Sequence, residues 1–469
     1  MKNFFYSIDY LCGGKEMKIK FLIIFFIMFL SSFCVMADVV VSDKNDNDEV
    51  ISLTQGQIIN LSKKFIADKK FDDARVLLSK SPFNVLELEI ERLFLLADIN
   101  MREGNIDEAI EIYRFILDYQ PNLSSVRLRL AEAYFLQKSW WRADYHFRLA
   151  GSDKNLPSEV YNNIAMALFM IRQNKNWNVW FNFGAAPDNN INNANSGEQC
   201  IMTVYGILCN ELPDPEKAVG FNVSFGANYE FKFSDTWRLR NEFMVYNSSY
   251  DKSEYDDLYL AYNVGGKYIY KGGEVFMGLA LNRRWLDHTP YSYSVGLKLN
   301  STYDFTKNFS GAFAVSYAPM YYDDFKDILD GEVVGVNARF SYAFDASKYL
   351  VLKLGGDDEN TKDKVYSNIR KNVAVGFGAE LPYGFSVYLE PSIQYQDYDK
   401  ERWFVKDYLF SEIKEKNITR KYSISFSNRK LKLFGFSPTI TYSYIDKNSN
   451  VWQREYNKST VEFTVNQSF

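Results

Sequence analysis

Two cysteines are the clearest pair of chemically reactive side chains in this sequence. The chain has four cysteines, and Cys12 and Cys34 lie in an N-terminal segment with the pattern of a removable export signal. That leaves Cys200 and Cys209 in an exported protein, where cysteines form disulfides by default. We therefore predict a disulfide between Cys200 and Cys209, with a pair of free thiols as the alternative.

No arrangement typical of catalysis or of cofactor binding accompanies these cysteines. His146 and His288 have no cysteine or carboxylate partner at metal-ligand spacing. Ser292 and Ser294 follow His288, but no nucleophile motif surrounds them, which leaves a hydrolase as a weak alternative. A Gly-rich phosphate-binding loop is also missing. We expect no enzymatic activity, no catalytic residue, no metal and no cofactor.

The elements that must position any functional group are strands with a two-residue alternation. In residues 373–395, Val373, Val375 and Phe377 share one face, a turn follows at 381–384, and the alternation then resumes. The same pattern recurs at 221–231, 334–344 and 461–469. Strands of about ten residues, apolar on one face and polar on the other, are typical of outer-membrane β-barrels, whereas soluble sandwiches favour shorter strands.

The alternation predicts about fourteen such strands, an even number like that of bacterial single-chain barrels. They are expected at 176–184, 218–233, 236–247, 258–270, 273–285, 291–305, 308–321, 332–345, 348–355, 367–381, 384–397, 416–428, 431–445 and 452–469. The fold class is thus a membrane β-barrel at 176–469 behind a helical N-terminal domain.

Charged residues on the polar face of these strands are expected to line the lumen. They are Arg238, Arg240, Glu242, Arg339, Glu380 and Glu390. A barrel of about this size has room for water unless something fills it. Two interpretations remain open: a conduit, or a sealed interior in which these charges pair with one another.

The connections between strands alternate in length, which orients the barrel. Short turns such as FTKN and LPYG are expected in the periplasm, and long loops such as YYDDFKDILDG and the segment 398–415 outside. With an even strand count, both ends of the chain lie in the periplasm. We expect contact with outer-membrane lipids, and recognition of the last strand, ending in Phe469, by the barrel-assembly machinery.

Residues 51–173 have helical periodicity and repeat themselves. Ala97, Gly104, Ala109, Tyr113 and Pro121 stand at the offsets of a tetratricopeptide repeat. Adding one repeat length of about 34 residues leads from Ala97, Ala109 and Tyr113 to Ala131, Ala143 and Phe147. Such repeats stack into a surface that holds a peptide or a neighbouring domain, so we predict a periplasmic helical domain that binds a partner. The alternative is a structural plug or spacer.

The N-terminus indicates export, and the composition narrows the partners. Residues 17–37 have a basic start, an apolar core and a small-residue cleavage site. We interpret 1–37 as a signal peptide, with Met17 as the expected true start and 38–50 as a disordered linker. The net charge is −5, which argues against nucleic acid as a partner. The 34 Tyr and 38 Phe suit two aromatic girdles.

The order of signal peptide, short repeat array and barrel resembles the surface lipoprotein assembly modulator (Slam) family, also described as type XI secretion translocators. Its most specific local feature is the segment GAAPDNNINNAN at 184–195, similar to the PD-x-NIN-x-A segment that these barrels carry after their first strand. The matching residues are Pro187, Asp188, Asn190, Ile191, Asn192 and Ala194.

The resemblance implies a translocator that moves client proteins, either surface lipoproteins or soluble haem-binding proteins, from the periplasm to the cell surface or medium. Periplasmic chaperones are further possible partners under this interpretation. The repeats are few relative to the family, so the client-binding role of the helices is open. The alternative function is a passive porin or a host-contact adhesin with a periplasmic scaffold.

Overall fold

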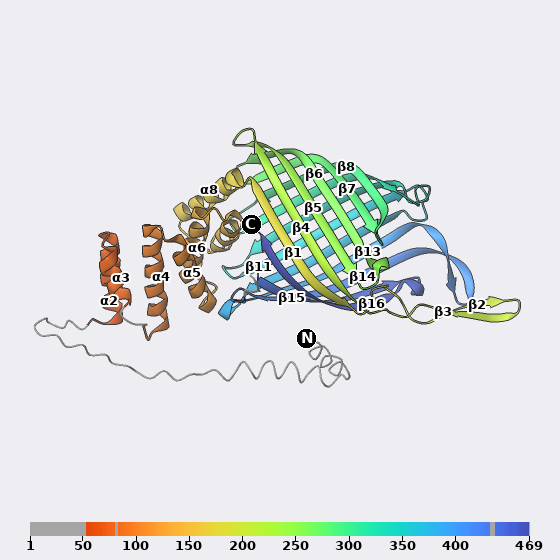
Figure 1. Ribbon diagram of the computed structural model, residues 1–469, viewed down its shortest axis with the longest axis horizontal. Helices are drawn as coiled ribbons and strands as arrows, with labels where there is room; N and C mark the ends of the chain where they lie inside the picture. Colours follow the sequence, from red (N-terminus) through yellow and green to blue (C-terminus); the bar gives the residue numbers. More distant parts are fainter. Residues whose placement is uncertain (1–52, 80–82, 432–436, 469) are drawn as a thin grey trace, which may run out of the picture. The chain divides into compact units, whose positions relative to one another are not determined.

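The computed structural model describes residues 53–79, 83–431 and 437–468. The expected signal peptide (1–37), the expected linker (38–50) and Phe469 lie outside the described residues. Residues 54–469 form one compact unit. Within it, Figure 1 shows helices at one end of a β-barrel, with the barrel strands strongly tilted.

The helices follow one another with short connections, as the repeat spacing predicts. They are α2 (Gln55–Ala67), α3 (Phe71–Ser79), α4 (Leu86–Glu103), α5 (Ile106–Tyr119), α6 (Ser124–Leu136), α7 (Trp140–Ala150) and α8 (Ser158–Asn174). Thr54 begins α2 with a capping box to Gln57, and Gly104 ends α4 at a φ of 88°, a left-handed conformation that glycine adopts without strain.

The residues at the repeat offsets form the core of the helical part. Ala97, Ala109, Tyr113, Ala131, Ala143 and Phe147 are all buried in one cluster. Small residues at these positions allow neighbouring helices to approach closely, and the aromatic rings fill the space beside them. Phe94 and Tyr113, for example, have ring centroids 5.8 Å apart.

The strands close into a fourteen-stranded antiparallel barrel in the order β1-β16-β15-β14-β13-β12-β11-β10-β9-β8-β7-β6-β5-β4, which confirms the predicted fold. Their bounds are β1 (Trp177–Asp188), β4 (Ala218–Lys232), β5 (Trp237–Tyr250), β6 (Asp257–Tyr270), β7 (Gly273–Leu286), β8 (Thr289–Asp304), β9 (Phe309–Tyr322), β10 (Gly331–Ala343), β11 (Lys348–Thr361), β12 (Asn368–Glu380), β13 (Phe385–Lys406), β14 (Leu409–Asn428), β15 (Ser437–Ser449) and β16 (Tyr456–Ser468). Closure leaves every barrel strand with two neighbours.

The prediction of a long loop at 398–415 was wrong. β13 and β14 continue through it as a paired hairpin that ends at Lys406↔Leu409. Asp407 and Tyr408 both have positive φ, 51° and 66°, which suits a two-residue hairpin turn. The charged residues of this segment suggested a loop because the strand extends beyond the apolar part of the wall, where both faces tolerate charge.

A second hairpin, which the sequence pattern did not predict, lies in the connection between β1 and β4. It consists of β2 (Glu198–Thr203) and β3 (Gly206–Glu211), which pair only with each other as a separate two-stranded sheet. The Met202 N–H donates to the Tyr408 carbonyl at 2.7 Å, so this hairpin contacts the turn of the β13–β14 hairpin. Both project at the end of the barrel opposite the helices (Figure 1).

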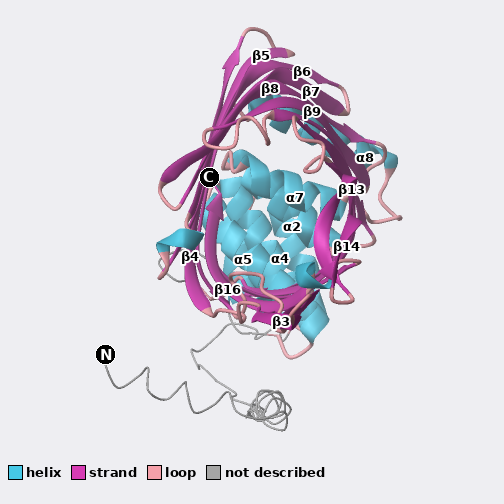
Figure 2. Cartoon of the chain, turned by 90° about the vertical axis from the view of Figure 1, so that its right-hand side faces the viewer, coloured by secondary structure: helices cyan, strands magenta, loops and turns pink. Residues whose placement is uncertain are grey.

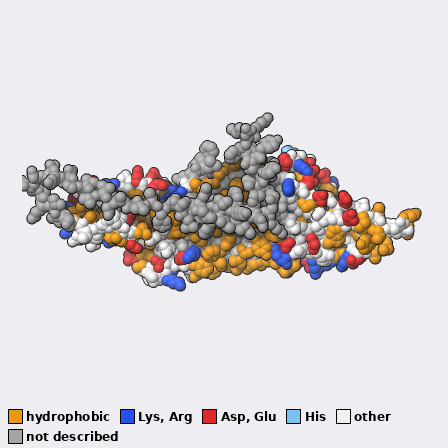
Figure 3. Space-filling view, turned by 90° about the horizontal axis from the view of Figure 1, so that it is seen from below, with side chains coloured by type: hydrophobic (Ala, Val, Ile, Leu, Met, Phe, Trp, Pro, Cys, Tyr) orange, Lys and Arg blue, Asp and Glu red, His pale blue; other side chains and the backbone are white. Residues whose placement is uncertain are grey.

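The outer surface of the barrel is apolar, with an aromatic belt near the short turns. Figure 3 shows hydrophobic side chains gathered over the middle of one face, with charged groups towards its ends. Neighbouring rings in the belt have centroids 4.9 to 6.5 Å apart, with Phe309 next to both Phe340 and Tyr342: Trp237, Tyr268, Tyr270, Tyr303, Phe305, Phe309, Phe340, Tyr342 and Phe344. Aromatic belts of this kind mark membrane interfaces. Among the helices that the structure describes, none has the length and hydropathy to cross a membrane.

This topology predicts which connections face the outside. An epitope tag in residues 322–331, between β9 and β10, should bind antibody on intact cells, because that loop lies at the end opposite the helices. A matched tag in residues 306–308, in the turn between β8 and β9, should bind only after the outer membrane is permeabilised. Whole-cell immunofluorescence measures both, and labelling of the second tag alone would contradict the orientation.

Candidate functional site

The candidate site is the junction between the helices and the short-turn end of the barrel. Figure 2 looks into the barrel and shows helices lying across its opening. Ion pairs join α5, α6, α7 and α8 to the strand ends and turns at 304–307, 380 and 428–430. We call these ion pairs and hydrogen bonds the rim contacts.

The most deeply buried rim contact joins Arg127 of α6 to Glu380, the last residue of β12. The Arg127 side chain is fully buried, its Nη2 donates to Glu380 Oε2 at 2.8 Å, and it also donates to the Pro121 carbonyl at 2.6 Å. Tyr145 Oη donates to the other oxygen of Glu380 at 2.6 Å. A charge so far from water is stable only when it is paired and hydrogen-bonded, so these contacts must form together.

A second rim contact centres on Arg429, which follows β14. Its Nη1 donates to Glu380 Oε2 at 2.9 Å, and its Nε donates to Asp118 Oδ1 of α5 at 2.6 Å. Its Nη2 also donates to the Leu117 carbonyl at 3.0 Å, so the guanidinium spans the end of α5 and the end of β12. Cations are favourable at the C-terminal end of a helix, where carbonyls lack partners.

A third rim contact lies at the turn between β8 and β9. Asp304 accepts a hydrogen bond from Arg148 of α7 at 2.6 Å and pairs also with Arg172 of α8. The Lys307 ammonium donates to the Asp153 carbonyl, after α7, at 3.0 Å. Contacts on different turns therefore hold the helices at separate points of the rim, which restrains both their position and their rotation.

Titratable groups beside Arg127 have shifted pKa values. Burial, and then the charge of Arg127, lower the pKa of His146 to about 3 from an ordinary 6.5. The Arg127 Nη1 lies 3.3 Å from His146 Nδ1, and because arginine can only donate, that nitrogen must accept and the imidazole is neutral. Burial and the Glu380 carboxylate raise the pKa of Tyr145, which keeps its hydroxyl a donor.

The predicted lumen-lining residues lie inside the barrel, largely in ion pairs. Glu390 pairs with Lys353 at 2.6 Å, and Arg240 with Glu242 at 3.6 Å. Arg238 is buried, pairs with Glu230 at 3.5 Å and donates to the Gln173 carbonyl at the end of α8. Glu380 belongs to the rim contacts, and Arg339 lines a cavity with Arg240. The interior is thus charged and mostly paired, and the helices cover its mouth.

The described residues leave several cavities between the helices and the inner wall, and we call two of them the lumenal cavities. The larger, of about 760 Å³, lies between α5–α7 and the inner ends of β1, β12, β13 and β14. The smaller, of about 370 Å³, contains six cationic and four acidic side chains: Arg148, Arg172, Lys175, Arg240, Lys267, Arg339, Asp144, Glu230, Glu274 and Asp304. Both are lined by polar groups suited to water or to a polypeptide backbone.

The segment at 187–194 that carries the family resemblance is a hydrogen-bonded corner. Pro187 and Asp188 end β1 rather than lying in the loop, which corrects the predicted strand end at 184. Asp188 accepts from the Asn190 N–H at 2.8 Å and pairs with Lys458 at 3.1 Å. Asn190 also exchanges hydrogen bonds with the backbone of Ala194 at 2.9 Å. These contacts join the end of β1 to β16.

The remaining motif residues anchor the returning chain. The Asn192 amide donates to the Asp214 carbonyl at 2.8 Å and accepts from the Glu216 N–H at 3.0 Å. The Ile191 N–H donates to the Glu216 carbonyl at 2.8 Å. The motif therefore holds both ends of the connection that carries the β2–β3 hairpin, which is a structural role.

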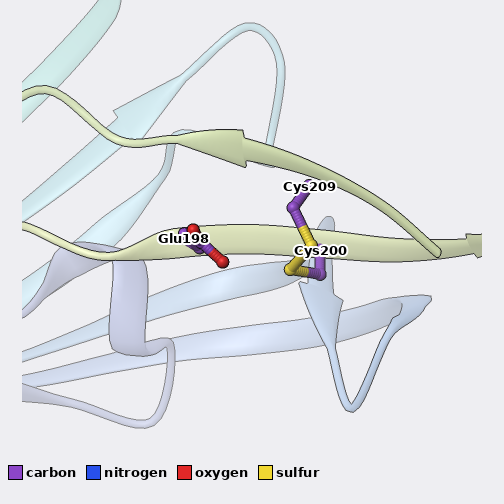
Figure 4. A group of neighbouring side chains, drawn as sticks. All are labelled: Glu198, Cys200 and Cys209. Carbon is purple, nitrogen blue, oxygen red and sulfur yellow. A yellow bond between two sulfur atoms is a disulfide. The ribbon is translucent and has the colours of Figure 1, made fainter.

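In the structure a disulfide joins Cys200 to Cys209, which lie opposite each other on β2 and β3. Glu198 is close to both sulfurs (Figure 4), so the three side chains lie within reach of a single ion. Sulfurs bonded to each other have no thiolate to offer a metal. The group therefore acts as a cross-strand staple of the hairpin.

Sequence reasoning missed most of the rim residues. Arg127, Arg148, Arg172, Asp304 and Arg429 looked like ordinary charges on a helix or in a turn. Arg127 is the residue whose role the sequence could have indicated, because it lies on the same helix face as Leu130 and Tyr134, which are both buried. A charge on a buried face needs a partner, but its partner is 253 positions away, and no local pattern identifies it.

The fold and this junction define an outer-membrane β-barrel whose inner mouth is covered by helical repeats. A family model described as "Surface lipoprotein assembly modifier" matches residues 177–469. The chain belongs to this family, which confirms the resemblance seen in the sequence.

Curated relatives extend the match into the helices. The Surface lipoprotein assembly modifier of Pasteurella multocida is 25% identical over 80% of this chain and 75% of its own length. Surface lipoprotein assembly modifier 1 of Haemophilus influenzae is 24% identical over 79% and 76%. Among solved structures, a Pseudomonas aeruginosa FadL homologue covers 70% of this chain and 93% of its own, with 8% identity and a TM-score of 0.37, too low to support an argument about function.

Because Arg127 pairs with Glu380 in a buried site, its substitution should lower the stability of the docked helices much more than substitution of the nearby Arg129. Arg127→Glu should destabilise the docked helices by about 3–5 kcal/mol, because it leaves Glu380 buried without its main partner. Arg129→Glu, two positions along the same helix, breaks a half-exposed pair with Glu132 and a longer pair with Asp98 at 3.7 Å, and should cost only about 1 kcal/mol. Chemical unfolding followed by circular dichroism measures both. Equal losses would show that the buried pair does not hold the junction.

His146 predicts an acid sensitivity of the same junction. Because the folded-state pKa is lower than 6.5, the unfolded helices bind a proton that the docked ones do not. The contribution of His146 is complete above pH 6.5 and decreases by about 1.4 kcal/mol per pH unit as the pH falls towards 3. His146→Gln keeps an acceptor for Arg127 without titrating, so the decrease in unfolding midpoint between pH 7.5 and 5 should be smaller in this variant. An identical decrease in both proteins would contradict the assignment.

Proposed function

We propose that the protein is a translocator that delivers specific client proteins, surface lipoproteins or secreted haem-binding proteins, from the periplasm across the outer membrane. Membership of the surface lipoprotein assembly modifier family supports lipoproteins as clients. The observation that carries the mechanism is the placement of the repeat helices across the barrel mouth by the rim contacts. A client bound to these helices is already at the entrance of a polar lumen.

In this proposal the rim contacts act as the closed state of an entrance. The helices cover the mouth while the ion pairs around Glu380 and Asp304 hold, and the charged interior beyond them accommodates a polypeptide without large apolar barriers. Release of the client from a chaperone inside, or its folding outside, supplies direction. The output is binding and passage rather than bond chemistry, with no cofactor.

The short connection between the helices and the barrel supports this proposal. Only Lys175 and Asn176 separate the end of α8 from β1, so the helices stay at high effective concentration beneath the barrel. A passive porin gains nothing from such a covered mouth. A host-contact adhesin would use the projecting hairpins instead and would not need the helices to be docked on the opposite end.

The proposal predicts that the helices are needed for delivery and not for insertion. Deleting residues 38–173 should leave a heat-modifiable barrel in the outer membrane but strongly reduce surface exposure of the client encoded beside the gene. Antibody accessibility of that client on intact cells, compared with its total amount, measures delivery. If the full-length protein leaves exposure of that product unchanged and conducts small solutes freely, the porin alternative replaces the translocator.

A further inference from the structure

We infer that a cavity between the helices and the foot of β1 binds an acyl chain of a lipid-modified client; this inference rests on the proposed function. The cavity has a volume of about 750 Å³ and is distinct from the lumenal cavities; we call it the junction cavity. It is lined by the end of α6, the start of α7, the end of α8 and the start of β1, with Leu136, Trp140, Trp141, Met170 and Trp177 among its side chains.

Seven of its thirteen lining residues are polar, Lys138 and Lys175 among them, but its largest side chains are apolar. Several of these apolar side chains are exposed, unlike those in the core of the helices. Leu136 is 58% exposed, Met170 40% and Trp177 51%, although each belongs to a different element. Large apolar side chains that converge on one cavity and remain open to solvent mark a binding surface. Its volume lies within the range of about 300–1,000 Å³ typical of small-molecule sites.

The junction cavity lies at the level of the membrane interface. Trp177 begins β1 and lies opposite Tyr229 of β4, with both side chains on the outer face of the barrel. Rings at this height belong to the region of the aromatic belt. The cavity therefore lies beside the face of the barrel that contacts lipid.

Two tryptophans lie between the junction cavity and the polar interior of the barrel. Trp140 and Trp141, at the start of α7, line the junction cavity and also the smaller lumenal cavity. The two parts of a lipid-modified polypeptide need different surroundings. The acyl chain must stay out of water, and the peptide must stay out of lipid. With the acyl chain in the junction cavity and the peptide in the lumen, both requirements are met across one pair of side chains.

The test uses the full-length protein in detergent and a synthetic triacylated lipopeptide with a photoreactive diazirine on an acyl chain. After irradiation, mass spectrometry should locate the label on peptides containing Leu136, Trp140 or Met170. Combining Leu136→Asn with Met170→Asn should reduce that labelling roughly tenfold, since small losses of apolar contact have large effects on binding in a hydrophobic site. The matched control is Met166→Asn, one turn earlier on α8, which is 59% exposed and lines a different cavity; its labelling should not change.

Further arms separate the possible sources of the acyl chain. The same peptide without acyl chains should not compete, whereas unlabelled lipopeptide should. If a diazirine phosphatidylethanolamine labels the same residues as strongly as the lipopeptide, the cavity contacts membrane lipid and the inference is wrong. Label found only elsewhere in wild-type protein also overturns it, and this arm needs no variant to fold.

The labelling is measured without translocation, so it is independent of the proposed function. A protein that labels at the junction cavity but never delivers a client contradicts the translocator and leaves the acyl site intact. A protein that delivers lipid-modified clients at an unchanged rate when both Asn substitutions are present contradicts the acyl site alone. Heat-modifiable migration of each variant confirms that its barrel is folded.

Discussion

Backbone hydrogen bonding in lipid is the constraint on which the rest of this structure depends. A strand can cross the membrane only when both of its edges are paired, so the sheet must close. Closure here joins β1 to β16, which are separated by almost the whole barrel sequence. Because the number of strands is even, the chain enters and leaves at the same end. That end is where the helices lie, and every rim contact follows from this placement.

The rim contacts show how two very different surfaces can be joined without a large apolar interface. The helical repeats have their own cores, and the barrel ends in polar turns, so little hydrophobic area is available between them. Arginines from both partners, Arg127 and Arg148 on helices and Arg429 on the barrel, meet carboxylates at the opposite surface. Buried ion pairs contribute little net stability but are costly to break singly. They therefore favour one position of the helices over others.

The two ends of the barrel are built for different tasks. At the inner end, charged pairs and two lumenal cavities lie beneath the helices, and the junction cavity opens beside them. At the outer end, β13 and β14 continue the wall as a long hairpin. The separate β2–β3 hairpin beside it carries the Cys200–Cys209 disulfide and is fixed at its base by the Asp188–Asn192 corner. The projecting hairpins at one end and the docked helices at the other suit the proposed passage of a client between them.

The sequence by itself determined the class of this protein. Apolar and polar side chains alternate along the long strands, as around Val373, Val375 and Phe377. They alternate because lipid outside the barrel favours apolar side chains and water inside favours polar ones. The spacing of Ala97, Ala109 and Tyr113 likewise predicted the helical repeats, because close helix packing requires small residues at fixed spacing. Both patterns are local: the alternation predicted the fourteen strands of the barrel but not the β2–β3 hairpin, and the repeat offsets predicted the helices.

Only the tertiary structure decided how these parts meet. Arg127 and Glu380 are 253 positions apart, and each is locally unremarkable, so their pairing emerges only when the closed barrel brings the end of β12 beneath α6. The hairpin at 398–415 was hidden for a related reason: beyond the lipid layer no solvent imposes an alternation, and pairing with the opposite strand replaces it. The junction cavity likewise exists only where α6, α7, α8 and β1 converge. The residue pattern of a single helix or strand depends on the solvent around it, so it can be recognised in the sequence. Contacts between elements far apart in the sequence depend on the closure of the whole barrel.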